Sequence, residues 1–529
     1  MPTALYINAK VWQPDGTFTE SFGVSNGHFD FSGSNTEANS LKNNYTEIID
    51  LNGKLVLPGI IDGHLHLVNG GVMMKRLDCS RINTIAELKT AIENYVSNNK
   101  VNWVIGGNLD LNKVFANHDT TGGNIVDDIF SELPLYITNY DYHSAICNSK
   151  ALALGGIDVN DNNLPKDEVE ISAAGKLTGF IAESVMYRVY NSIPPPSLNE
   201  KAAAVSDCIE MLHSFGITSV GDITLPDDID VYIKLYSQNK LNIRINSYIP
   251  FDEFDNLQFY LDKTAEIDKD YFSIVGFKAF WDGSLGSETA LFSQNYKGRS
   301  HNGFTTEIVR SGRIYELAKK IDAAGMQMII HAIGDKAISE VLELYAGLPN
   351  TKRLRHRIEH AQHIQPADLN KFGEYGVIAS VQPLHLKYDA RTVFEKLPAK
   401  LIPHTHNYIH ILKLGGVMNF GTDFPIVEAD PFENIRLAVT RYTEFGEFTP
   451  EHKIPLHECI KSYTLNNAYA SHNENAVGNI TKGKVADFVI MNEDIFEMDE
   501  EGLSKVTIFE THLGDNLVYK KNCHSEPIE

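Results

Sequence analysis

The sequence lacks three features that would assign it to particular classes of protein. Its five cysteines among 529 residues include no Cys-x-x-Cys pair, so neither a disulfide framework nor a thiolate zinc site is expected. A formal net charge of −23 argues against binding to nucleic acid or to an anionic membrane, because both require a basic surface. No basic leader precedes an apolar block, and no apolar run approaches the length of a membrane span. We therefore expect a cytoplasmic protein that acts on a small molecule.

The composition is that of a globular protein with a large core. Hydrophobic residues make up 43% of the chain and charged residues 22%. At 529 residues the chain is too long for one ordinary domain, although a barrel with insertions could take most of it. Residues 4–56 and 478–491 show short apolar runs between Gly and Asn turns, a pattern that predicts antiparallel β-structure at both ends.

The most informative stretch is the apolar run from Leu57 to Leu67, which predicts a buried strand. In strand geometry His64 and His66 point to the same face, so two imidazoles converge on one point. Neutral imidazole is the commonest metal ligand in proteins, and a strand fixes both ligand directions. The alternative is a pair of hydrogen-bonded core histidines at a strand end.

Further apolar runs alternate with amphipathic helical stretches, which is the pattern of repeated βα units. After the first strand, we place the strands at 218–222, 241–249, 275–281, 327–331, 356–360, 377–382 and 417–422. Helices are predicted at 228–237, 313–324 and 336–346, the last two ending at Gly325 and Gly347. Eight such units predict a (β/α)8 barrel with its chemistry at the carboxyl ends of the strands. The interval from 69 to 196 is too long for a βα connection, so it must form a domain of its own.

Four residues at predicted strand ends could complete a metal site with the two histidines: Lys278, His331, His360 and Asp423. Each has an ordinary alternative, namely a lysine paired with a carboxylate, two core histidines, and a turn or helix-capping aspartate. Asp282 is a competing ligand or salt-bridge partner for Lys278. His356 competes with His360, since the two share a strand face by period two, but His356 lies nearer the barrel floor.

The segment Pro58-Gly59-Ile60-Ile61-Asp62-Gly63-His64-Leu65-His66 resembles the first-strand signature of the amidohydrolase superfamily of metal-dependent hydrolases. Downstream matches narrow the resemblance to the branch of the N-substituted formamide deformylases and YtcJ-like proteins. It implies an α/β fold with a (β/α)8 TIM barrel formed by 57–68 plus 197–474. A small β-sandwich would combine 1–56 with 475–529, and 69–196 would be an inserted domain over the active site.

The resemblance also implies the chemistry of the site. The implied ligands are His64, His66, Lys278, His331, His360 and Asp423, holding two zinc ions, with manganese, iron or cobalt as alternatives. Lys278 would carry a carbamate derived from CO2 that bridges the two ions. Metal-activated hydroxide would attack the substrate carbonyl, with Asp423 as general base and then general acid.

The resemblance implies cleavage of a non-peptide amide C–N bond, in an N-acyl or N-formyl amine. Alternatives are opening of a cyclic amide or imide, a mononuclear site in which unmodified Lys278 forms an ion pair, and a catalytically silent barrel that binds a ligand. Candidate substrate-binding residues are His143, in the segment Asp141-Tyr142-His143, and Trp281, Asp282 and His385. Asn139, Ile146 and Glu288 depart from the branch's usual residues, so the deformylase substrate is not carried over. Family members are often dimers, so a homodimer is one expectation.

Overall fold

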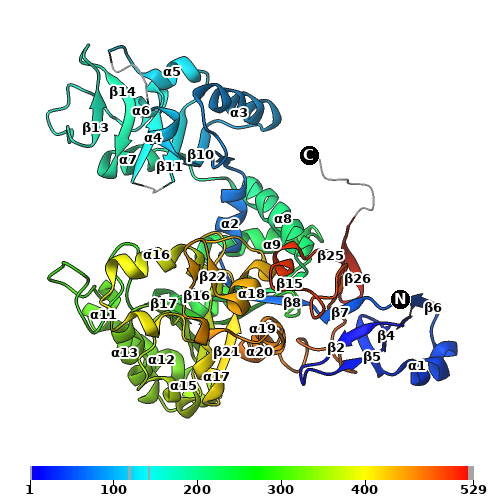
Figure 1. The fold of residues 1–529 in the computed structure, drawn as a ribbon. Helices are drawn as coiled ribbons and strands as arrows, with labels where there is room; N and C mark the ends of the chain where they lie inside the picture. Colours follow the sequence, from blue (N-terminus) through cyan, green and yellow to red (C-terminus); the bar gives the residue numbers. More distant parts are fainter. Residues whose placement is uncertain (1–2, 117–120, 141–142, 522–529) are drawn as a thin grey trace. The chain divides into compact units, whose positions relative to one another are not determined.

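The computed structural model describes residues 3–116, 121–140 and 143–521. The chain divides into two compact units (Figure 1). One unit takes residues up to 70 together with those from 205 onward, and the other takes residues 71–204. The sequence predicted an inserted domain at 69–196, and the second unit spans residues 71–204.

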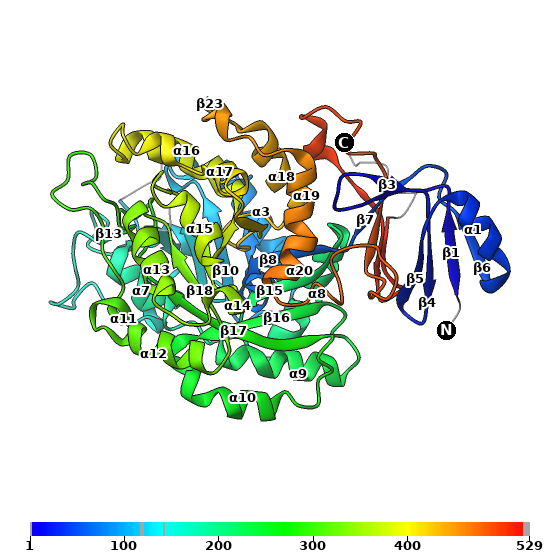
Figure 2. The ribbon, with the colours of Figure 1, turned by 90° about the horizontal axis from the view of Figure 1, so that it is seen from below.

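The first unit is built around an eight-stranded parallel sheet that curls into a barrel with helices outside it (Figure 2). In spatial order its strands are β8 (Ile60–Leu65), β15 (Ile217–Ile223), β16 (Arg244–Pro250), β17 (Phe272–Phe280), β18 (Gln327–Ala332), β19 (Arg357–His360), β20 (Ile378–Val381) and β21 (Val417–Phe420). The predicted helices are α9 (Ile229–Ser237), α12 (Arg313–Ala323) and α13 (Asp335–Ala346). The predicted TIM-barrel fold class is confirmed.

The first predicted strand is in fact two strands that belong to different sheets. β7 (Leu55–Pro58) pairs with β2 (Lys10–Trp12) and β24 (Phe488–Met491), whereas β8 pairs with β15 in the barrel. The chain changes sheet at Gly59, where a Cβ would collide with the hydroxyl of Thr218. A continuous apolar run hid this change, because both strands are buried on both faces.

Side chains complete the barrel between its first and last strands, since the described residues form no ladder between β8 and β21. The buried carboxylate of Asp62 accepts hydrogen bonds from the Thr422 amide (3.0 Å) and hydroxyl (2.6 Å). Asn467, on α20 (Leu465–Ala470), donates to carbonyl oxygens of both strands, Ile61 on β8 and Phe420 on β21. These contacts hold the carboxyl ends of the two strands together.

The β-sandwich draws on both ends of the chain. One sheet has the order β5 (His28–Gly33), β4 (Ser21–Ser25), β1 (Ala4–Ile7) and β6 (Glu47–Asp50). The other has the order β26 (Asn516–Lys520), β25 (Ile508–Leu513), β24, β7, β2 and β3 (Phe18–Thr19). The predicted antiparallel pattern is wrong at two places, because β1 pairs with β6 and β2 with β7 in parallel. In both cases the intervening residues return the chain to the end of the sheet where it started.

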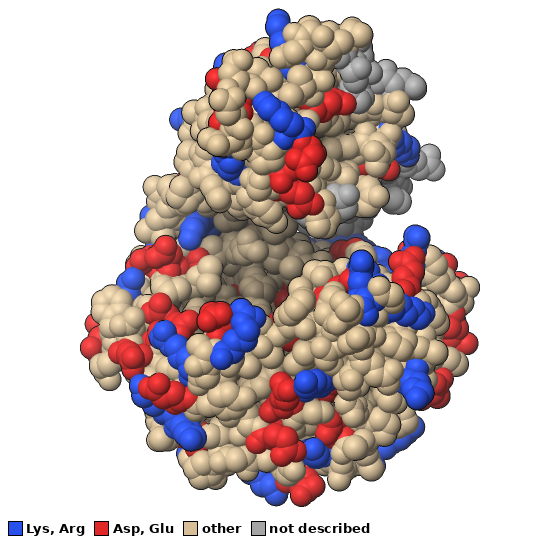
Figure 3. All heavy atoms as spheres, turned by 90° about the vertical axis from the view of Figure 1, so that its left-hand side faces the viewer, with Lys and Arg blue, Asp and Glu red and all other residues tan. Residues whose placement is uncertain are grey.

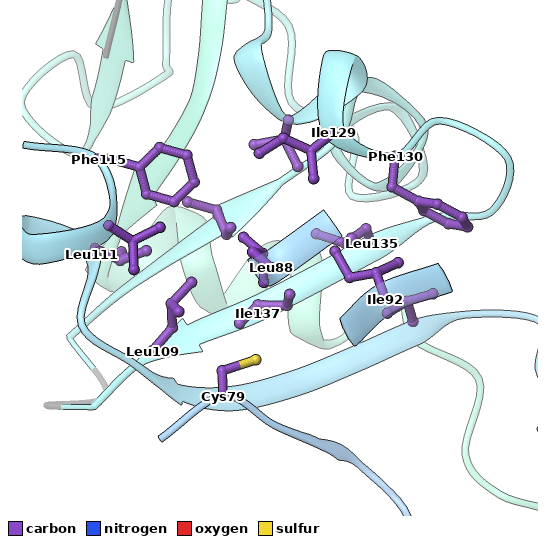
Figure 4. Packing of buried hydrophobic residues seen from close by; sticks show 14 residues of the cluster. Cys79, Leu88, Ile92, Leu109, Leu111, Phe115, Ile129, Phe130, Leu135 and Ile137 are labelled. Carbon is purple, nitrogen blue, oxygen red and sulfur yellow. The ribbon is translucent and has the colours of Figure 1, made fainter. Parts of the chain in front are cut away.

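The inserted unit has its own six-stranded sheet and hydrophobic core (Figure 4). Its strands follow the order β13 (Val169–Ile171), β14 (Leu177–Ala182), β12 (Ser144–Cys147), β11 (Leu135–Asn139), β10 (Val104–Leu109) and β9 (Leu77–Asp78). Helix α3 (Ile85–Asn98) is capped by Thr84 and buries Leu88 and Ile92 in the cluster that contains Leu135 and Ile137. Such a core is what an independently folding domain requires.

Surface charge, helix hydrophobicity and the state of the cysteines complete the description of the fold. On the face drawn in Figure 3, basic and acidic side chains of the barrel unit are interspersed. Among the described residues no helix has both the length and the apolar character that crossing a bilayer needs. Four cysteines are buried free thiols, and Cys523 lies outside the described residues.

Candidate metal centre

All six predicted ligands lie at or just beyond the carboxyl ends of barrel strands. His64 is on β8, Lys278 on β17, His331 on β18 and His360 on β19, while His66 follows β8 and Asp423 follows β21. His64, His360 and Asp423 each offer a ligand atom within 4.8 Å of the other two. The His331 and His360 rings are 4.5 Å apart between centroids. The barrel therefore gathers residues that are far apart in the chain.

Three of the histidines each direct one ring nitrogen at an oxygen acceptor. His64 Nδ1 donates to Glu359, His360 Nδ1 donates to Gln382 Oε1 at 2.8 Å, and His331 Nε2 donates to the Gly283 carbonyl at 3.1 Å. Each of these bonds fixes the tautomer and leaves the lone pair of the other ring nitrogen free. This arrangement is typical of histidines that bind a metal.

Asp423 lies against two of these histidines. Its Oδ1 is 3.3 Å from Nε2 of His64 and 3.3 Å from Nε2 of His66. Because His64 Nδ1 donates to Glu359, the Nε2 atom carries a lone pair, and this lone pair faces the Asp423 carboxylate. Two electron-rich atoms in contact repel each other unless a cation lies between them. Either a proton or a divalent metal ion meets the need. Nitrogen and oxygen donors of this kind suit zinc and the neighbouring transition metals.

Lys278 is the most unusual group of the site. Its side chain is 3% exposed, and Nζ has no hydrogen-bond partner among the described residues. Burial lowers the pKa of the amine from 10.5 to about 8, although Glu359 and Asp423 oppose the shift. A buried amine with an accessible neutral form and unfilled hydrogen-bonding capacity fits a lysine that reacts with CO2. The residues present therefore fit the metal and carbamate that the resemblance implies.

Electrostatics keep His331 and Asp423 in forms that can bind metal. Burial and the nearby Lys278 lower the pKa of His331 to about 3, so its imidazole is neutral. Burial alone would raise the pKa of Asp423, but hydrogen bonds with His64 and His66 hold it well below the usual range. The carboxylate is therefore ionised.

The structure separates His360 from its competitor, His356. His356 lies on the helix side of the barrel wall, where Nδ1 accepts from the Met328 amide and Nε2 is 3.3 Å from Asp322 of α12. The sequence argument that both histidines share a strand face is wrong. His360 has φ +70°, so the backbone leaves strand geometry there and turns its side chain toward His64 and His331.

Sequence reasoning missed the groups that support the ligands. Arg357 donates to both oxygens of Glu359, at 2.8 and 2.9 Å, and both side chains are buried. Burial would raise the pKa of Glu359, but Arg357 and His64 hold it well below its usual range. The available signal was an Arg-x-Glu pair directly before His360, at alternate positions of a buried strand, where unpaired charges are rare.

The four predicted substrate-binding residues have different surroundings. His385 Nε2 is 3.7 Å from Asp423 Oδ2, and Gln362 donates to its Nδ1. Asp282 is an anchor, since its carboxylate accepts from three backbone amides, those of Leu291, Ile333 and Gly334. The structure thus brings His385 to the site and uses Asp282 to hold the loops behind His331.

Trp281 and His143 each have partners within their own unit. The Trp281 indole is fully buried, and its Nε1 donates to Glu340 of α13 at 2.8 Å. His143 belongs to the inserted unit, where its Nδ1 is 3.0 Å from Glu183 and its side chain is 73% exposed. The preceding motif residues Asp141 and Tyr142 lie outside the described residues.

The three departures from the branch pattern also have local partners. Ile146 is buried in the core of the inserted unit, and Asn139 accepts a hydrogen bond from the Leu111 amide in the same unit. Glu288 pairs with Arg299 at 2.8 Å. Each of the three residues therefore has a contact within its own unit.

Comparisons with known proteins agree with this architecture. Residues 47–519 match the model described as "Amidohydrolase family". The chain is 27% identical to the putative amidohydrolase YtcJ of Bacillus subtilis, over 96% of this chain and 97% of the relative. It is 24% identical to the N-substituted formamide deformylase of Arthrobacter pascens, over 98% and 99% of the two chains. A solved structure of an uncharacterised metal-dependent hydrolase from Pyrococcus horikoshii OT3 superposes with a TM-score of 0.79, at 24% identity, covering 94% and 99% of the two chains.

Proposed function

Because the chain belongs to the amidohydrolase family, we propose that it is a metal-dependent hydrolase that cleaves the amide C–N bond of a linear N-acyl or N-formyl amine. The observation that carries the proposal is the convergence of His64, His360 and Asp423 beside the buried, unpaired amine of Lys278. The likeness to a formamide deformylase, at 24% identity, supports the choice of a linear amide over a cyclic one.

The residues that would hold metal are His64, His66, His331, His360 and Asp423, with Lys278 as a carbamate between two zinc ions. Divalent ions bound there would supply Lewis acidity, which makes water a better nucleophile near neutral pH and polarises the scissile carbonyl. Glu359, Gln382 and the Gly283 carbonyl would orient the histidines, because each accepts from the ring nitrogen that faces away from the centre.

Asp423 is the group that we assign to proton transfer. Its carboxylate is ionised and 6% exposed, so it can take a proton from the attacking water and return it to the departing amine. His385 is suited to orient this carboxylate. Its Nδ1 accepts from Gln362, so the proton resides on Nε2, the nitrogen that faces Asp423 Oδ2.

The test is turnover of an amide panel by purified protein supplied in turn with zinc, manganese and cobalt. The panel contains N-formylbenzylamine, N-acetylbenzylamine and, as a cyclic imide, succinimide. Release of benzylamine that is lost in Asp423→Asn and kept in the exposed matched control Asp227→Asn is the expected result. Turnover of succinimide alone would redirect the proposal to ring opening, and a panel with no turnover would indicate a ligand-binding barrel.

Metal content separates the two forms of the centre. Near two metal ions per chain, falling in Lys278→Ala, is the result expected for a carbamate-bridged pair. One ion per chain in both proteins would exclude the bridge and leave Lys278 as an unmodified residue of a mononuclear site.

A further inference from the structure

The inserted unit contains a cavity of about 260 Å³ that none of the candidate metal ligands lines. We call it the tyrosine pocket, after its three tyrosines. The residues that define it here are Arg76, Tyr136, Thr138, Tyr187 and Tyr190, all from residues 71–204. Its volume is below the range of about 300–1,000 Å³ typical of sites for drug-sized molecules, so its occupant is smaller than those.

Arg76 supplies the pocket with a positive charge whose hydrogen-bonding capacity is not filled. Its Nε is buried without a hydrogen-bond partner among the described residues. Nη2 reaches the Tyr190 hydroxyl at 3.4 Å, a long hydrogen bond. Asp78 also lines the pocket, but its carboxylate is engaged by the amide and hydroxyl of Ser80. The free capacity of Arg76 therefore favours an anion.

Tyr136 adds a second donor to the same cavity. Tyr136 lines the cavity, and only 2% of its surface is exposed. Burial raises the pKa of this phenol, so the hydroxyl keeps its proton and can donate.

The walls of the pocket are aromatic and apolar. The Tyr136 and Tyr190 rings lie 5.9 Å apart between centroids, and Tyr187 and Met186 complete this side. Gly107 also lines the pocket, and a Cβ there would lie 2.9 Å from the Thr138 hydroxyl. Aromatic walls of this kind favour a flat ring that can pack against them.

We propose that the tyrosine pocket binds a small aromatic carboxylate, with the carboxylate at Arg76 and Tyr136 and the ring against Tyr187 and Tyr190. One guanidinium and one hydroxyl match the charge and the two oxygens of a carboxylate. A phosphate would leave most of its charge unmatched and would not use the aromatic walls. The proposal does not depend on the hydrolase activity, because it concerns binding to the inserted unit.

The test is calorimetric titration of the metal-loaded, full-length protein with benzoate. Acetate tests the charge without the ring, and benzyl alcohol tests the ring without the charge. The variants are Arg76→Gln, Tyr136→Phe and the matched control Arg81→Gln, which alters an exposed arginine of the same unit. Loss of a hydrogen bond to a charged group weakens binding about tenfold to a hundredfold.

We expect the parent protein to bind benzoate more tightly than acetate or benzyl alcohol. Benzoate should bind at least tenfold more weakly to Arg76→Gln and several-fold more weakly to Tyr136→Phe than to the parent. Its affinity for Arg81→Gln should equal that for the parent. Three outcomes would overturn the proposal. They are no benzoate binding to the parent protein, acetate binding as tightly as benzoate, and benzoate binding that Arg76→Gln leaves intact but metal removal abolishes. The last outcome would place the carboxylate at the metal centre, and it would leave the proposed hydrolase function standing.

Discussion

Replacing Lys278 with methionine should make the metal-free protein more stable while it abolishes the function. The amine is buried without a hydrogen-bond partner, and its pKa falls from 10.5 to about 8. At about 1.4 kcal/mol per pKa unit, keeping this amine charged at neutral pH costs the folded state about 3 kcal/mol. Methionine has a similar length and no charge, so we expect a gain of about 1–3 kcal/mol in the free energy of unfolding.

The pH dependence gives the prediction a second, independent signature. A lysine whose pKa is lowered on folding destabilises the folded state in full below the folded pKa, here about 8. That cost disappears as the pH rises to the unfolded pKa of 10.5. The stability difference between Lys278→Met and the parent protein should therefore shrink between pH 8 and pH 10.5.

The assay is urea denaturation in the presence of a chelator, at several pH values, with Lys319→Met as the control for loss of an exposed lysine. The reasoning is refuted if Lys278→Met is less stable than the parent at pH 7 without metal. Added zinc and bicarbonate should stabilise the parent by mass action and leave Lys278→Met nearly unchanged.

Three further predictions concern Glu359, Asp423 and Trp281. Glu359→Gln should weaken metal binding about 10- to 100-fold and cost about 3 kcal/mol of stability, because it replaces the charged acceptor of His64 with a neutral amide and leaves the Arg357 charge buried without a carboxylate. Metal titration and urea denaturation measure the two effects, and an unchanged metal affinity would contradict the prediction. Asp423→Asn should lower kcat by about 10²- to 10⁴-fold, because the asparagine side chain cannot accept the proton. Steady-state kinetics with the substrate that the panel identifies measure this, and a decrease in kcat of less than tenfold would disprove the prediction. Trp281→Phe should cost about 1 kcal/mol, through its lost bond to Glu340, with KM unchanged; a KM change of tenfold would show that the indole influences the substrate.

The sequence was sufficient for the barrel because its strands are apolar runs of the right length, and each candidate ligand stands at the end of one run. It was insufficient wherever the backbone departs from regular geometry. Gly59 moves the chain between two sheets within one apolar run, and the positive φ of His360 breaks the alternation that the comparison with His356 assumed. The orientation of Trp281 could not be inferred either, because neighbouring residues of a strand point to opposite faces and the register was not known.

The supporting groups were missed for a different reason. Glu359 and Gln382 act through single hydrogen bonds to ring nitrogens, and which acceptor meets which histidine depends on pairing between strands. A sequence motif can identify a metal-binding histidine, but it does not identify the residue that accepts that histidine's hydrogen bond. The tyrosine pocket could not be predicted from the sequence for the same reason. Arg76 and Tyr136 are 60 positions apart, and only the folding of the inserted unit brings them to one cavity.

The side-chain closure of the barrel has a consequence for the order of events during synthesis. Asp62 and Thr422 are 360 positions apart, and the entire inserted unit is translated between them. His64 and His66 leave the ribosome early, whereas Asp423 emerges after every other candidate ligand. The nascent chain therefore cannot present all six candidate ligands until Asp423 has been made, when about a fifth of the chain is still to be synthesised.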